Sequence, residues 1–292
     1  MNQAIIELYD NFTHGRMSRR AFMDGMTRLA GSTAAATAML PLLQCDYSKA
    51  ETISATDPRL ATETVSYDWP KGKATGYLAR PKAMGKRPVV IVIHQNRGLN
   101  PHIMDVARRY AVEGYLAFAP DLLSVAGGTP ATDDGARDAH AAANKDDMLA
   151  AAIAAAAFVK THAESNGKVG SVGFCYGGGV IDQMALNSQN VDASVAYYGP
   201  VPADKSKVAS IKGPLLLHYA GIDTFVNPGI PAWEEALKAA GKKYTIHMYP
   251  NVNHSFSDDT AGARFDKAAA DLAWTRTLAF FRENLGAPPN AA

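Results

Sequence analysis

From about residue 60 onward, hydrophobic and polar positions follow two alternating spacings along the chain. Continuous β-branched runs such as Pro88–His94 are typical of strands buried on both faces of a sheet. Segments such as Asn100–Gly114 carry apolar residues at helical spacing and predict helices. The same patterns predict strands at 115–121, 167–175, 192–199, 213–221 and 243–250, and helices at 146–164, 178–188, 230–241 and 265–284. Repeated strand–helix units favour a mostly parallel sheet with helices on both faces.

Three segments depart from this alternation. Glu63–Trp69 and Ala74–Pro81 alternate residue by residue around a Pro-Lys-Gly-Lys turn, which predicts an antiparallel hairpin at a sheet edge. Val125–His140 is polar and contains glycines, so we expect a surface loop there. Residues 1–60 are polar and alanine-rich and carry no strand signal. We therefore expect an N-terminal extension at 1–60, an α/β domain at 61–286 and a tail at 287–292.

The extension has two interpretations. Arg19 and Arg20 precede Phe22 and a weakly apolar segment, which resembles a twin-arginine export signal that would be removed. Asp24 and Arg28 interrupt that segment on its N-terminal side and favour a helical arm that stays with the chain. The location of the protein therefore stays open between periplasm and cytoplasm.

Composition and charge exclude several classes of protein. The 292 residues carry a net charge of +1 and no basic block, unlike a nucleic-acid-binding protein. No apolar run reaches the ~18 residues that a membrane-spanning helix needs. Cys45 and Cys175 are too few for a disulfide framework or a four-thiolate zinc site, and we do not expect them to pair. We expect a small-molecule partner and no metal or cofactor, and a homodimer is left open.

A glycine-rich turn carries the clearest candidate chemistry. Gly173-Phe174-Cys175-Tyr176-Gly177 matches the G-x-S-x-G nucleophile elbow, with cysteine in place of serine. A strand is predicted before this turn and a helix after it. Such a turn is strained, and its glycines avoid collisions with the neighbouring strand and helix. The helix N-terminus favours a thiolate, so Cys175 is a candidate nucleophile. The alternative is a buried thiol on a closely packed turn.

A cysteine nucleophile needs a base, and the base needs an acid that orients it. Asp223 and His254 each follow a predicted strand, in the chain order nucleophile, acid, histidine. A turn-forming role is the alternative for Asp223. The backbone N–H groups of Asn96 and Tyr176 are candidates for an oxyanion hole. Of the other histidines, we expect His94, His218 and His247 to pack in or near the sheet, and His14, His140 and His162 to lie at the surface.

These motifs, in this order, resemble the dienelactone hydrolase family within the α/β-hydrolases. The similarity covers about residues 60–286 and rests on the stretches VVIVIHQNRGLN, NGKVGSVGFCYGGG, AGIDTFVNPGI and NHSF. The resemblance implies an α/β-hydrolase fold. It also implies hydrolysis of an ester or lactone by a triad of Cys175, Asp223 and His254, without a cofactor.

Two departures from the family pattern bear on the site. Family members place a glutamate after the first long strand, where it interacts with the thiol, whereas this chain has Gln95 followed by Asn96. An amide cannot take the thiol proton as a carboxylate could, so His254 would act directly. The family's dienelactone specialists also hold the substrate carboxylate with arginines. Arg97 and Arg264 are the candidates here, with structural salt bridges as the alternative, and Gln95 is a further candidate for substrate contact.

The hypothesis from the sequence is therefore an ester or lactone hydrolase that acts through Cys175. The alternative is a redox-sensing or ligand-binding protein on the same fold, because a thiol of low pKa oxidises readily.

Overall fold

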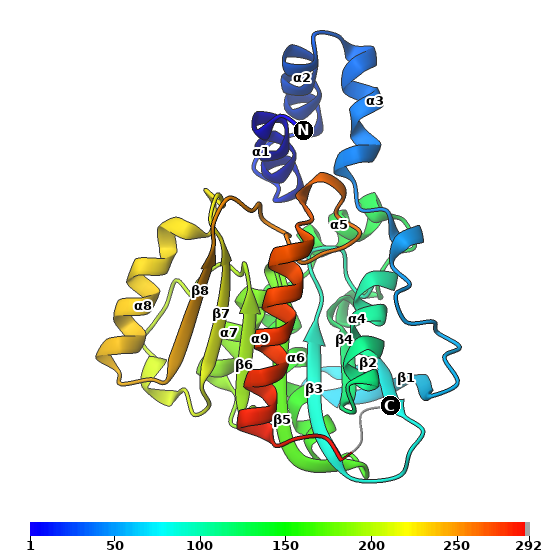
Figure 1. The fold of residues 1–292 in the computed structure, drawn as a ribbon, viewed down its shortest axis with the longest axis vertical. Helices are drawn as coiled ribbons and strands as arrows, with labels where there is room; N and C mark the ends of the chain where they lie inside the picture. The colour runs from blue at the N-terminus through cyan, green and yellow to red at the C-terminus, as the bar shows by residue number, and fades with distance from the viewer. Residues whose placement is uncertain (290–292) are drawn as a thin grey trace.

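The computed structural model describes residues 1–289, apart from the side chain of Ser48. These residues contain an eight-stranded sheet with the order β1-β2-β4-β3-β5-β6-β7-β8 (Figure 1). The strands are β1 (Leu60–Trp69), β2 (Gly72–Pro81), β3 (Arg87–Ile93), β4 (Leu116–Asp121), β5 (Ser165–Phe174), β6 (Ala193–Tyr197), β7 (Leu215–Ala220) and β8 (Tyr244–Tyr249). β3 to β8 pair in parallel with one another. The predicted α/β-hydrolase fold is confirmed.

The first two strands form the antiparallel hairpin at the edge of the sheet that the sequence predicts. Leu60 of β1 pairs with Pro81 of β2, and β2 in turn runs antiparallel to β4. The parallel strands that follow all end at one edge of the sheet. Loops at that edge hold ligands in open parallel sheets, and Cys175 and Asp223 follow β5 and β7 there.

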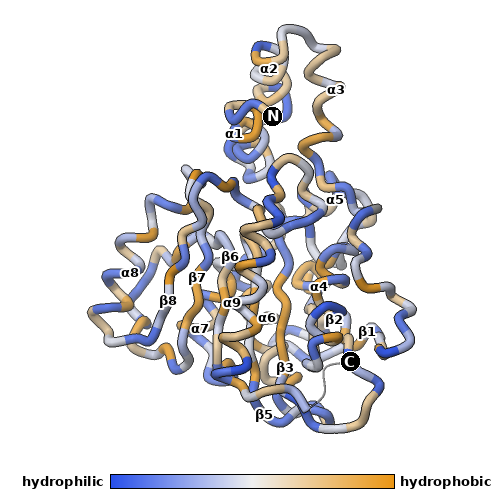
Figure 2. Tube along the Cα trace, in the orientation of Figure 1, coloured by the Kyte–Doolittle hydropathy of each residue, from blue (hydrophilic) through white to orange (hydrophobic). Residues whose placement is uncertain are grey.

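Helices cover both faces of the sheet, as the alternating pattern predicts. Val89, Ile91 and Ile93 of β3 belong to one hydrophobic core, and Val90 and Val92 to another, because successive side chains of a strand point to opposite faces. Figure 2 shows apolar colour concentrated on the central strands. The first core includes residues of α6 (Lys145–Lys160), α7 (Tyr176–Asn187) and α8 (Ile230–Ala239), and the second includes residues of α4 (Pro101–Val112) and α9 (Lys267–Leu285).

The N-terminal extension is helical and has a small core of its own. Its helices are α1 (Gln3–Thr13), α2 (Arg19–Ala30) and α3 (Thr33–Leu43). Asn2, Ser18 and Ser32 cap them, each accepting a hydrogen bond from a backbone N–H of the first turn. Their shared core is made of Ile5, Ile6, Tyr9, Phe22, Met26, Ala36 and Leu43. Figure 1 shows the three helices together, over the end of the sheet where the parallel strands finish. Removal of the extension as an export signal stays a prediction.

The prediction of a surface loop at Val125–His140 is wrong in part, because this segment contains most of a helix. α5 (Asp133–Ala142) begins after Thr132, whose side chain accepts a hydrogen bond from Gly135 N. Asp133 and Asp134 then occupy its first turn, where carboxylates are favourable. Short 3₁₀ helices complete the described elements: Tyr47–Lys49, Leu122–Ala126, Val208–Ser210, Asn227–Gly229 and Gly262–Arg264.

Two further predictions concern the C-terminal tail and membrane-spanning helices. The last three residues of the predicted tail, 290–292, lie outside the described residues. Among residues 1–289, no helix has both the length and the apolar composition that crossing a membrane requires.

Candidate active site

Cys175 lies directly after β5, at the turn into α7. Its backbone has φ 54° and ψ −120°, a combination that non-glycine residues rarely adopt. A Cβ atom at Gly173 would lie 2.2 Å from the carbonyl oxygen of Gly177, and one at Gly177 would lie 2.5 Å from the carbonyl oxygen of Ile93. Glycine is therefore required at both positions, and the turn holds the Cys175 side chain at the end of the sheet.

Asp223 and His254 form a hydrogen-bonded pair beside this turn. Oδ1 of Asp223 accepts hydrogen bonds from the backbone N–H groups of Phe225 (2.9 Å) and Val226 (3.0 Å). Oδ2 of Asp223 lies 2.6 Å from Nδ1 of His254, so Nδ1 carries the proton that joins them. Burial would raise the pKa of Asp223, but His254 and the two backbone donors hold it below its usual range.

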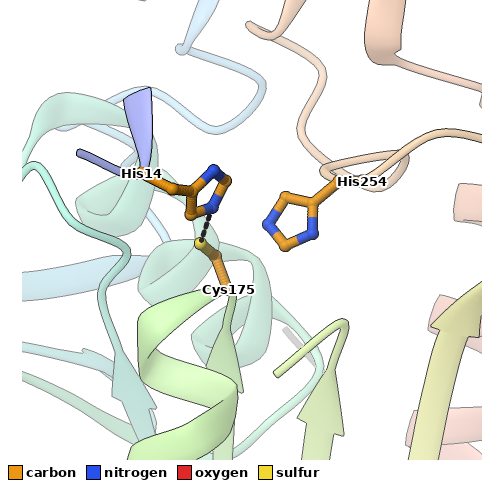
Figure 3. Close-up of side chains that lie close together, drawn as sticks. All are labelled: His14, Cys175 and His254. Atoms are coloured by element: carbon orange, nitrogen blue, oxygen red, sulfur yellow. Dashed lines mark hydrogen bonds between the residues drawn. The ribbon is translucent and has the colours of Figure 1, made fainter. Parts of the chain in front are cut away.

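Two imidazole rings flank the sulfur of Cys175 (Figure 3). Nε2 of His14 lies 3.3 Å from Sγ. His254 approaches from another side, and one ring nitrogen of each histidine and Sγ all lie within 4.8 Å of one another. Nε2 of His254 has no hydrogen-bond partner among the described residues. We interpret His14, Cys175 and His254 as a group that can exchange protons, because His14 is hydrogen-bonded to the sulfur and His254 lies beside both.

The surrounding imidazoles set the charge of the thiol. Burial alone would raise the pKa of Cys175, but the charges of His254 and His14 lower it to about 5. Burial likewise disfavours the charged form of His254, yet Cys175 and Asp223 raise the pKa of His254 well above its usual value. Both shifts favour transfer of the thiol proton to an imidazole, and the thiolate is the nucleophilic form of cysteine.

The two residues predicted for the oxyanion hole line the same cavity as Cys175. Tyr176 is the first residue of α7, and the N–H groups of a helix's first turn have no partner within the helix. Asn96 lies in the loop after β3, where its side chain donates a 2.9 Å hydrogen bond to the carbonyl oxygen of Thr13. Asn96, Tyr176 and Cys175 line one cavity. Their oxyanion role stays a prediction.

Gln95 contacts a carboxylate. Its Nε2 donates a 2.9 Å hydrogen bond to Oδ2 of Asp258. The other oxygen of Asp258 accepts hydrogen bonds from the backbone N–H (2.9 Å) and the hydroxyl (2.6 Å) of Thr260. The sulfur of Cys175 has its hydrogen bond with His14 rather than with Gln95.

Arg97 and Arg264, the candidates for binding a substrate carboxylate, are buried in ion pairs within the chain. Nε of Arg97 lies 2.9 Å from Asp133. Arg264 lies 3.3 Å from Asp10 of α1 and also donates to the carbonyl oxygen of Leu43 at 3.4 Å. These contacts match the salt bridges that the sequence left as the alternative. Contact of either arginine with substrate stays a prediction.

A cavity of about 490 Å³ opens onto Cys175. One wall comes from the extension and the other from the α/β domain. The wall from the extension is made of Phe12, Thr13, His14, Gly15, Met17 and Arg19. The opposite wall is made of Asn96, Arg137, Asp138, His140, Ala141, Lys145, Cys175, Tyr176, Pro200 and Phe225. The volume falls within the range of roughly 300–1,000 Å³ of small-molecule sites.

His140 is wrong as a surface prediction, and His14 is partly exposed. His140 is buried, with its ring 4.4 Å from that of Tyr176. His14 ends α1 and contacts Cys175, which lies 161 positions away along the chain. No local pattern in the sequence signals such a contact. The only available sign was a histidine in a segment with its own helical caps, which suggests a folded arm.

A second group of titratable side chains lies apart from the thiol. Nε2 of His102 lies 3.6 Å from Asp258, and Nδ1 of His102 lies 3.2 Å from Asp259. Arg109 contacts Asp259 as well. The spacing of His102, Asp258 and Asp259 would suit a cation, but His102 already contacts both carboxylates and Arg109 pairs with Asp259. We assign this group a structural role.

Comparison with known proteins gives two family matches. The sequence pattern of the dienelactone hydrolase family matches residues 74–285. A second pattern, described as YqhI-like, matches residues 1–30. The first covers most of β2 and all of β3 to β8, and the second covers α1 and α2.

Individual relatives agree with the first match. "Putative carboxymethylenebutenolidase" of Saccharolobus solfataricus is 30% identical over 255 residues, which cover 75% of this chain and 97% of the relative. "Putative hydrolase fragment YghX" of Escherichia coli (strain K12) is 48% identical over 106 residues, covering 35% of this chain and 91% of the relative. The crystal structure of "Putative Dienelactone Hydrolase" from Klebsiella pneumoniae has a TM-score of 0.69 at 27% identity, covering 77% of this chain and 99% of that one.

Proposed function

The chain belongs to the dienelactone hydrolase family, and on this premise we propose that it hydrolyses a carboxylic ester or lactone through Cys175. Asp223 and His254 complete the proposed catalytic triad. The observation that carries the proposal is the 2.6 Å hydrogen bond between Asp223 and His254, next to a buried thiol whose pKa is lowered to about 5. A base held by a carboxylate beside a nucleophile is the arrangement that acyl transfer requires.

In the first half of the proposed reaction, an ester becomes a thioester. His254, oriented by Asp223, takes the proton of Cys175, and the thiolate adds to the carbonyl carbon. The backbone N–H groups of Asn96 and Tyr176 donate to the oxyanion, and one such donor is typically worth ~100- to 1000-fold in rate. The C–O bond then breaks as His254 returns the proton to the leaving oxygen.

In the second half, water releases the acyl group. His254 removes a proton from a water molecule while the water oxygen adds to the thioester carbon. The C–S bond breaks and the sulfur of Cys175 recovers the proton. The products are a carboxylic acid and an alcohol, or one opened hydroxy acid when the substrate is a lactone.

The cavity favours a neutral substrate with an apolar group. Phe12, Met17 and Phe225 contribute apolar surface to its walls. Of its basic residues, Arg19 is paired with Asp134 at 3.0 Å, and Arg137 with Asp134 and Asp138 at 2.8 Å each. The third, Lys145, donates a hydrogen bond to the carbonyl oxygen of His140. Neither Arg97 nor Arg264 is among the described residues that line it. We therefore propose a small neutral ester or lactone in preference to an acidic dienelactone.

Replacing Cys175 tests this function. We expect Cys175→Ala to abolish hydrolysis of a small aryl ester, because the thiol is the attacking group, while the chain stays folded. The matched control is Cys45→Ser, which alters the other cysteine and should keep the activity. Activity is measured by release of the phenol and folding by thermal denaturation.

Two results would count against the proposal. Full activity in Cys175→Ala would contradict it directly. A wild-type protein that cleaves none of a panel of esters and lactones, yet is reversibly oxidised at Cys175 by peroxide, would favour the redox-sensing alternative.

A further inference from the structure

We propose that His14, at the C-terminal end of α1, is a second catalytic imidazole that accepts the thiol proton of Cys175. This inference rests on the proposed role of Cys175 as nucleophile. It makes the N-terminal extension part of the active site. It also revises the first half of the reaction proposed above: His14, in place of His254, takes the thiol proton and passes it to the leaving oxygen, and His254 keeps the proton transfer from water.

The hydrogen bonds of His14 fix which of its nitrogens is free to act as a base. Nδ1 lies 2.6 Å from the carbonyl oxygen of Asp10. A carbonyl oxygen can only accept, so Nδ1 carries a hydrogen. In the neutral ring Nε2 is then an unprotonated acceptor, and it lies 3.3 Å from Sγ of Cys175. The contact between His14 and Cys175 is therefore the one that an S–H donor makes to a base.

Contacts on several sides hold His14 in this position. At the start of α1, the Gln3 side chain donates a 2.7 Å hydrogen bond to Asn253, next to His254. At its end, the carbonyl oxygen of Thr13 accepts from Asn96 at 2.9 Å. The guanidinium of Arg16 lies 3.5 Å from the centre of the Phe225 ring. The extension is thus fastened to the loops that carry the other proposed catalytic residues.

His14 also supplies what Gln95 cannot. The amide of Gln95 has no proton-accepting nitrogen and is bonded to Asp258 at 2.9 Å. His14 provides a base at hydrogen-bonding distance from the sulfur, and it comes from an element outside the sheet.

The extension does not simply block the site. The cavity of about 490 Å³ lies open beside Cys175 with α1 in place, and Phe12, His14 and Met17 line it together with Tyr176 and Phe225. A substrate can occupy this space while His14 stays against the sulfur. The extension is accordingly a wall of the substrate pocket.

The proton balance is simple. In the resting enzyme the S–H bond of Cys175 breaks and an N–H bond forms at Nε2 of His14. When the thiolate has added to the carbonyl and the C–O bond breaks, this proton passes to the leaving oxygen. His254 then activates water, and the water proton reaches sulfur as the C–S bond opens.

The test compares His14→Gln with His254→Gln and with His162→Gln as a matched control remote from the thiol. The first readout is the pH profile of Cys175 alkylation by iodoacetamide, followed by peptide mass spectrometry, which needs no substrate. We expect the wild-type and His162→Gln profiles to rise near pH 5. The His14→Gln profile should shift to higher pH, with alkylation at about pH 6 slowed at least tenfold.

The second readout separates the two halves of the reaction with a p-nitrophenyl ester in a stopped-flow experiment. His14→Gln should slow the acylation burst by about 100-fold and leave the deacylation rate within twofold of wild type. Added imidazole should restore acylation in His14→Ala, which a structural role would not allow. This rescue keeps the test valid if glutamine disturbs the fold.

An unchanged alkylation profile in His14→Gln, or faster hydrolysis in that variant, would overturn the role of His14. Either result leaves the proposed function standing if Cys175→Ala is inactive. A wild-type protein without esterase activity would overturn the proposed function instead, and the alkylation profiles would still decide whether His14 deprotonates the thiol.

Discussion

The side chain at position 95 shows how one residue limits the chemistry of its neighbours. Gln95 donates to Asp258, whose other oxygen is bound to Thr260. An acid at position 95 would place two carboxyl groups within hydrogen-bonding distance in a buried setting, and both could not ionise cheaply. The neutral amide of Gln95 therefore suits a position next to the carboxylate of Asp258. The base that deprotonates Cys175 must then be another residue.

We expect Gln95→Glu to be destabilising in a pH-dependent way. The shared proton would raise the pKa of the new pair in the folded state. A raised folded-state pKa gives stability that is present at low pH and lost as the pH rises through it. The melting temperature of Gln95→Glu should therefore drop further below that of wild type as the pH rises from about 5 to about 8. At the upper end, the free energy of unfolding should be lower by about 1–3 kcal/mol. Gln95→Ala, whose loss should not vary with pH, is the control. A flat pH dependence for Gln95→Glu would contradict the argument.

Among the elements, α1 depends on one buried cation of the α/β domain. The Arg264 guanidinium contacts Asp10 at 3.3 Å and the carbonyl oxygen of Leu43 at 3.4 Å, and it lies 5.0 Å from the centre of the Tyr9 ring. It thereby joins the two ends of the extension to the loop before α9. Because Asp10 also accepts the Nδ1 hydrogen of His14 through its carbonyl oxygen, this anchor extends to the proposed active site.

Arg264→Ala should loosen the extension. Breaking a buried ion pair on one side leaves its partner unpaired and costs about 3 kcal/mol. We expect faster hydrogen exchange in the amides of α1, with the amides of β3 and β5 unchanged, and a smaller effect from Asp10→Asn. If Arg264 instead binds a substrate carboxylate, Arg264→Ala would raise KM for acidic esters alone and leave the exchange of α1 unaltered.

For the whole molecule, local patterns predicted the sheet because each strand and helix carries its own periodicity. The elbow around Cys175 was visible because its glycines are contiguous in sequence. Asp223 and His254 were candidates because each follows a strand that ends at the same edge. These inferences needed only neighbours along the chain and the rule that parallel strands finish together.

The contacts that could not be predicted from the sequence join segments that lie far apart along the chain. Arg97 pairs with Asp133, which begins a helix in a stretch that was expected to be a loop. Arg264 pairs with Asp10, and Cys175 with His14, across more than half of the chain. Thr132 followed by Asp133 is a helix-start signal that glycine and proline nearby concealed. Nothing local placed the extension over the thiol.

In the proposed reaction, Cys175 forms a covalent bond with the acyl group of the substrate. The most direct measurement is rapid acid quenching of the wild-type protein with a p-nitrophenyl ester, followed by peptide mass spectrometry. We expect one acyl group on the peptide that contains Cys175, removable by hydroxylamine and absent from Cys175→Ala. Hydrolysis at the full rate with the acyl group on another residue, or with none at all, would contradict it.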